Sequence, residues 1–159
     1  MKPINLVTPK TTERGQSLVE LALGFTFILI LLAGAINFGE AFFIWIALRE
    51  ATQEGAVYAA RHPAAINDTE IRNRVRAAVQ TEIPSFNINR LDTNIERSTS
   101  PICPGNAITV SARYRFSILV PFVSTAVAIV LPTENGTPYI DVRASTTNTV
   151  LISDDTGCP

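Results

Sequence analysis

The longest apolar stretch of the chain lies near its N-terminus. No residue between Leu21 and Gly39 is charged, and a helix over this range would extend about 28 Å, close to the roughly 30 Å of a bilayer's hydrocarbon core. The helical pattern continues to Arg61, where His62-Pro63 predicts the end because a residue before proline avoids the α region. We therefore predict a long helix over residues 16–62, of which about 21–39 spans a membrane.

A second helix is predicted after this long one. Asn67-Asp68-Thr69-Glu70 is typical of a helix start, with Asn67 or Asp68 as the N-cap and Glu70 able to complete a capping box from Asn67. The residues that follow place one apolar stripe on the helix, which predicts an amphipathic helix packed on a core and ending at Pro84. The stripe consists of Ile71, Val75, Val79 and Ile83.

After Pro84 the pattern becomes that of β-strands. Ile108–Phe116 alternates between apolar and polar residues, Tyr139–Ile152 is rich in Val, Ile and Thr, and Asn87–Glu96 fits a short strand. Glu134–Pro138 is expected to form a turn. Residues 63–159 are thus predicted to be an α+β domain with two or three antiparallel strands and helices on one face.

The segment Ile118–Leu131 is nearly all apolar and lies between the predicted strands. Its uncharged core is short for a second membrane span, and Pro121 would disturb a helix that crosses a bilayer. We predict a short helix or a hydrophobic loop, and membrane re-entry or a contact with another subunit are the alternatives.

The start of the long helix carries the most informative motif. Gly15-Gln16 is followed by the acid Glu20, directly before the apolar run. An acid at the edge of hydrocarbon costs free energy unless it stays at head-group depth, is protonated or finds a cation, so Glu20 is a candidate functional residue. The cations that precede the run, Lys2, Lys10 and Arg14, favour a cytoplasmic N-terminus and an exported C-terminal region.

This motif resembles the class 3 signal peptide of type IV pilin-like proteins. The resemblance implies that residues 1–15 are a leader peptide, which a prepilin peptidase removes after Gly15. Gln16 would become the new N-terminus, and Glu20 would pair with the terminal amine of a neighbouring subunit during assembly.

The wider stretch, formed by Gly15–Leu23, Asn37–Gly39 and Arg49–Ala56, resembles the TadE-like minor pilins (pseudopilins) of tight-adherence pili. It implies that the partners are other pilins or pseudopilins, the pilus assembly platform, the prepilin peptidase and the membrane. Leu21 follows the acid where the major pilins of these systems usually carry tyrosine. With the long region after the helix, this difference argues against the major filament subunit.

Two other functions remain open from the sequence. Ala33-Gly34-Ala35 resembles a signal-peptidase site, and cleavage there would release a soluble binding domain that begins at Ile36. The length of the leader, the position of Glu20 and the helical pattern beyond the cut argue against this alternative. A membrane-anchored, exported sensor or enzyme with an intact leader is the other.

Small residues recur at multiples of four along the long helix. Such residues let another backbone approach closely, in lipid or in a bundle. A partner helix and the protein's own globular domain are both candidates for the neighbour of Ala47–Ala59. The series consists of Ala35, Gly39, Ala47, Ala51, Gly55 and Ala59.

Cys103 and Cys158 are the only cysteines, so an exported domain could form one intramolecular disulfide, and two reduced thiols are the alternative. The net charge of −1 gives no electrostatic footprint for nucleic acid. His62 is the sole histidine and is expected at a helix end, and neither a phosphate-binding loop nor metal-ligand spacing is present. The chain is therefore predicted not to be an enzyme and to need no cofactor.

Overall fold

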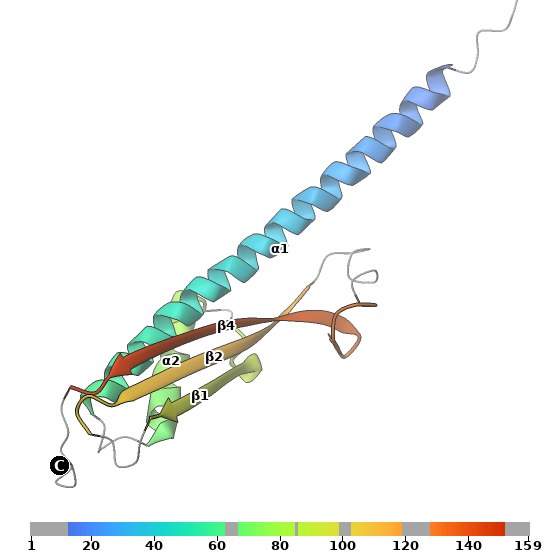
Figure 1. Cartoon of the computed structure of the whole chain (residues 1–159). Coiled ribbons are helices and arrows are strands. Elements are labelled where there is room, and N and C mark those ends of the chain that lie inside the picture. The colour runs from blue at the N-terminus through green and yellow to red at the C-terminus, as the bar shows by residue number, and fades with distance from the viewer. Residues whose placement is uncertain (1–12, 63–66, 85, 99–102, 119–127, 152–159) are drawn as a thin grey trace, which may run out of the picture.

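The fold consists of one long helix, a shorter helix and a small antiparallel sheet (Figure 1). The computed structural model describes residues 13–62, 67–84, 86–98, 103–118 and 128–151. Helix α1 spans Glu13–Arg61, so it begins before the predicted residue 16 and ends where His62-Pro63 predicted. The expected α+β fold, with a long apolar N-terminal helix and a second amphipathic helix, is confirmed.

Helix α2, Asp68–Glu82, begins at Asn67, whose side chain accepts a hydrogen bond from the Glu70 backbone N–H at 3.0 Å. Asn67, and not Asp68, is therefore the N-cap. The Glu70 carboxylate accepts a hydrogen bond from the Tyr58 hydroxyl of α1 at 3.0 Å, a partner that the capping-box pattern did not predict. Ile71, Val75 and Val79 are buried against the core, as their spacing predicted, and Ile83 is partly buried at its edge.

The sheet has the strand order β1-β2-β4-β3 and is antiparallel throughout. Its strands are β1 (Leu91–Arg97), β2 (Ala107–Ser117), β3 (Thr133–Glu134) and β4 (Thr137–Thr149). The three predicted strands are present, and β3 adds a two-residue ladder to β4. β1 begins later than the predicted Asn87, because the Asn87 side chain caps a 3₁₀ turn, η1 (Ile88–Arg90), by accepting from the Asn89 N–H at 3.2 Å.

A tight turn joins β3 to β4. Asn135 and Gly136 have φ angles of 53° and 78°, the consecutive left-handed conformations that an Asn-Gly pair favours between two paired strands. The turn predicted over Glu134–Pro138 is therefore present.

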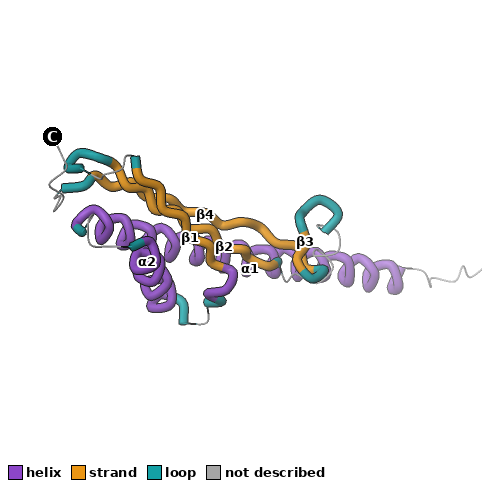
Figure 2. Tube along the Cα trace, turned by 90° about the horizontal axis from the view of Figure 1, so that it is seen from below, coloured by secondary structure: helices purple, strands orange, loops and turns teal. Residues whose placement is uncertain are grey.

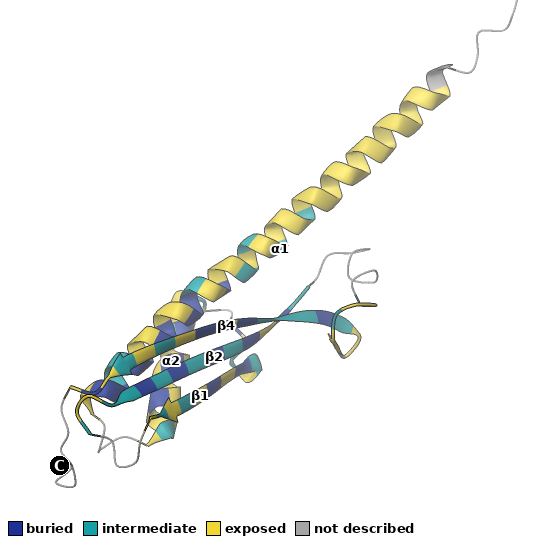
Figure 3. Ribbon diagram, in the orientation of Figure 1, coloured by how far each residue is buried: buried dark blue, intermediate teal, exposed yellow. Residues whose placement is uncertain are grey.

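The core lies between the sheet and the two helices, which cover the same face of the sheet (Figures 1 and 2). Alternate residues of β2 point into it, and Leu48 of α1, Val75 of α2 and Val110 of β2 are fully buried there. The buried Thr52 of α1 reaches the sheet, where its hydroxyl lies 3.0 Å from that of Thr146. The C-terminal half of α1 is thus a core element of the domain, while its N-terminal half extends away from it (Figure 3).

Two predictions concern residues outside the described ranges. Cys158 lies there, so its disulfide with Cys103 stays a prediction. Residues 119–127 of the apolar segment Ile118–Leu131 also lie there, and the described end of that segment, residues 128–130, forms a turn before β3.

Candidate assembly surface

The predicted membrane part of α1 is exposed on all sides. Gly15–Arg61 contains a window apolar and long enough to cross a bilayer, and no part of that window is buried in the molecule. Large side chains such as Leu21, Phe27 and Leu32 lie more than half exposed. Since exposing apolar surface to water costs about 25 cal/mol per Å², this half of α1 is better suited to lipid or to contact with other helices than to water.

The two polar side chains inside the apolar run bond to the helix itself. The Thr26 hydroxyl donates to the Ala22 carbonyl at 2.8 Å, and the Asn37 amide donates to the Ala33 carbonyl at 2.9 Å. A polar group in hydrocarbon is costly when it lacks a partner. These bonds lower the cost of placing both residues in an apolar environment.

The motif residues Gly15, Gln16 and Glu20 all lie within α1. Glu20 is exposed and lines a shallow depression of about 410 Å³ along the helix, together with Ser17, Gly24 and Phe25. Gly15 and Gly24 have open space where a Cβ would lie. The acid is therefore accessible to another molecule, and the structure describes no cation that pairs with it within the molecule.

The small-residue series divides into two parts with different surroundings. Ala47, Ala51 and Ala59 are buried, and a Cβ on Gly55 would lie 2.6 Å from Cγ2 of Val75. This half of the series packs on the protein's own domain. Ala35 is exposed and a Cβ on Gly39 would meet no atom within 4 Å, so a role in contacts with partner helices stays a prediction for these two positions.

An apolar groove lies where α1 leaves the domain. It has a volume of about 620 Å³, with Ile36, Gly39 and Phe43 on its α1 side and Phe86 and Tyr114 on the domain side. The rings of Phe86 and Tyr114 lie 4.2 Å apart, and burial raises the pKa of the Tyr114 hydroxyl. Glu40 and Glu82 also line the groove, which gives its apolar wall an acidic rim.

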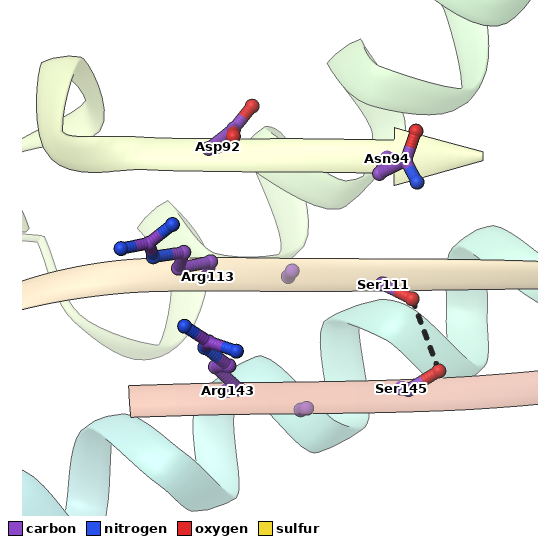
Figure 4. Close-up of a pocket in the computed structure, with 8 residues that line it drawn as sticks. Asp92, Asn94, Ser111, Arg113, Arg143 and Ser145 are labelled. Atoms are coloured by element: carbon purple, nitrogen blue, oxygen red, sulfur yellow. Dashed lines mark hydrogen bonds between the residues drawn. The ribbon is translucent and has the colours of Figure 1, made fainter. Parts of the chain in front are cut away.

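The outer face of the sheet is polar and carries rows of side chains across the strands (Figure 4). Asp92, Arg113 and Arg143 form one row, and the next contains Ser111 and Ser145, whose hydroxyls lie 3.1 Å apart. Arg113 donates to Asp141 at 2.5 Å, which lowers the pKa of the Asp141 carboxyl. The charges of this face largely neutralise one another, so it is well suited to face solvent.

His62 is the one residue that the sequence offered as a possible base. His62 is exposed at the end of α1, where Nδ1 lies 3.2 Å from the Tyr58 carbonyl oxygen. Among the described residues, no group of His, Cys, Asp and Glu is arranged to hold a metal ion.

An aromatic stack on α1 was not predicted from the sequence, although the spacing of its residues could have indicated it. Phe38, Phe42 and Trp45 stack in succession, with ring centroids 6.5 and 5.8 Å apart, and the Arg49 guanidinium lies 5.7 Å from the centroid of Trp45. Steps of three and four residues place all four side chains on one face of the helix.

A known protein family has a model that matches the start of α1, including its acid and its apolar run. Residues 15–57 match the family model of TadE-like protein. The match confirms the resemblance drawn from the sequence, and it covers both the exposed half of α1 and most of the half that packs on the domain. No curated protein and no solved structure matches the chain. The TadE-like match implies a role in the context of pilus assembly. The long apolar helix is consistent with a pilin that is anchored in a membrane.

Proposed function

We propose that the chain is a non-catalytic pseudopilin, or minor pilin, that takes part in the assembly of a tight-adherence type IV pilus. In this proposal a prepilin peptidase removes residues 1–15, α1 crosses the membrane with its N-terminus in the cytoplasm, and residues 63–159 are exported. Glu20 then pairs with the terminal amine of a neighbouring pilin.

The observation that carries the proposal is the exposed apolar half of α1, which begins with Gly15 and Glu20 inside the TadE-like match. Exposure of this apolar surface to water would be costly, whereas a pilin would insert it first into a membrane and then into a helical bundle. The exposed positions Ala35 and Gly39 would allow close approach of a neighbouring helix in that bundle.

The position of the new N-terminus separates this proposal from the two alternatives. A pseudopilin begins at Gln16, a domain released by signal peptidase begins near Ile36, and an anchored sensor or enzyme keeps its leader. N-terminal sequencing of the exported protein distinguishes all three. Helix α1 continues without a break across Ala33–Ile36, which favours a chain that keeps this segment.

Substituting Gly15 tests the processing step. Gly15→Leu should leave a slower-migrating precursor, because the resemblance implies that the peptidase cuts after this glycine. Gly24→Leu is the matched control, since its Cβ also meets open space within the same helix, and it should be processed normally. Processing of Gly15→Leu at the wild-type rate would remove the main support for the pilin proposal.

Substituting Glu20 tests the assembly step. Glu20→Gln keeps the size of the side chain and removes its charge, so the protein should be cleaved and inserted but should co-purify poorly with partner pilins. An unpaired terminal amine in a low-dielectric helix bundle accounts for the expected loss. Glu50→Gln, at another exposed position of α1, is the control and should assemble as the wild type does. Normal pilus formation by Glu20→Gln would show that the acid has no part in assembly.

A further inference from the structure

Two neighbouring apolar residues in the turn before β3 are highly exposed. Ile129 is 86% and Val130 is 82% exposed, which sets them apart from the buried apolar residues of the sheet. The chain is held in place directly after them, because the Tyr139 N–H of β4 donates to the Pro132 carbonyl at 3.1 Å. The turn therefore projects from a fixed point at the end of the sheet.

This end of the sheet extends in the same general direction as the N-terminal half of α1 (Figure 1). Tyr114 of β2 lines the same groove as Ile36 and Phe43 of α1. From Tyr114, β2 continues to Ser117, which carries the sheet roughly 10 Å further at about 3.4 Å per residue. Since 10 Å corresponds to about seven residues of a helix, the end of the sheet lies level with the last turns of the apolar run.

Side chains suited to the border of a bilayer lie on the domain side of this level and beside the turn. On α1, Phe38, Phe42 and Trp45 form an exposed stack that ends at Arg49, the first cation after the apolar run. On the sheet, the Arg115 guanidinium lies 5.9 Å from the ring centroid of Tyr139, next to the turn. Trp, Tyr and Arg are enriched at such borders because each has an apolar body and a polar end.

We propose that the Ile129–Val130 turn inserts into the leaflet on the exported side, so that the domain contacts the bilayer at a second point besides α1. This inference rests on the proposed membrane insertion of α1. A lipid surface is favoured over a second protein copy because the turn lies level with the apolar run and beside residues typical of a bilayer border. The contact would fix the orientation of the domain on the membrane before assembly.

Quenching by brominated lipids tests the inference on the full chain, because Trp45 is the only tryptophan. In a Trp45→Phe background, Val130→Trp is reconstituted in vesicles of phosphatidylcholine and phosphatidylglycerol with brominated acyl chains. We expect its fluorescence to be lost to the same extent as that of Phe27→Trp, which reports the insertion of α1. Thr147→Trp, on the polar outer face near the other end of β4, should instead be quenched by iodide from the aqueous phase.

The variants distinguish failure of this inference from failure of the proposed function. If Phe27→Trp is quenched by lipid while Val130→Trp is quenched only by iodide, α1 is inserted and the lipid contact is wrong. If Val130→Trp is shielded from both quenchers, protein covers the turn, and the lipid contact is again wrong. If Phe27→Trp is not quenched by lipid, the proposed membrane insertion fails, and this inference fails with it.

Discussion

At the scale of single residues, the same residue type has different surroundings along one helix. Gly39 and Gly55 both belong to the small-residue series of α1. Gly39 lies at the apolar groove with open space around it, whereas Gly55 lies against Val75, with Val110 of the sheet nearby. The tertiary contacts, which the series itself does not encode, decide which glycine is needed for folding.

Substitution of these two glycines by leucine should separate folding from assembly. Gly55→Leu should lower the free energy of unfolding by about 3 kcal/mol, because Cβ alone would lie 2.6 Å from Val75. Gly39→Leu should leave the stability of the domain unchanged and weaken crosslinking to partner helices. Thermal unfolding of the full chain in detergent micelles measures the first effect. Equal melting temperatures for the two variants would contradict the assignment of Gly55 to the core.

At the scale of elements, the periodicities of the sequence predicted most of the fold. The stripe Ile71–Ile83 and the alternation of Ile108–Phe116 led directly to α2 and β2, because each has one buried face. The start of β1 could not be predicted, since the Asn87 side chain stabilises a 3₁₀ turn in a region with strand-like composition. The groove between Ile36 and Tyr114 was also beyond prediction, because it depends on how α1 crosses the end of the sheet.

The cap of α2 offers a test at this scale. Asn67→Ala should destabilise the protein by about 1 kcal/mol, because the Glu70 N–H would lose the side-chain oxygen that it donates to. Asn73→Ala is the matched control, since Asn73 is exposed within the same helix and alanine is the better helix former there. Denaturant unfolding in micelles compares the two variants. A loss of stability in Asn73→Ala as large as that in Asn67→Ala would show that the cap has no special role.

At the scale of the whole molecule, α1 has an exposed N-terminal half and a C-terminal half that is buried against the domain. Its residues from Ile44 onward include every one of its buried apolar side chains, while the run from Leu21 to Gly39 has none. The motif Gly15–Glu20 could be recognised from the sequence because its residues are consecutive in the chain and lie directly before the apolar run. The apolar run to Gly39 also indicated where the exposed half of α1 ends, but the packing of the other half on the domain could not be predicted, since it depends on where the sheet and α2 lie.

This division predicts that the domain keeps its fold without the exposed half of α1. A chain of residues 36–159 should unfold at nearly the same temperature as the full chain, because it retains Ile44, Leu48 and the rest of the buried face. A chain of residues 52–159 should lose cooperative unfolding, because it lacks Ile44, Ala47, Leu48 and Ala51, and deleting even one large core side chain typically costs about 2–5 kcal/mol. Circular dichroism melts in the same detergent compare all three chains. If the 36–159 chain is unfolded, the exposed half of α1 contributes to the stability of the domain. The separation of the helix into an exposed half and a core half would then be wrong.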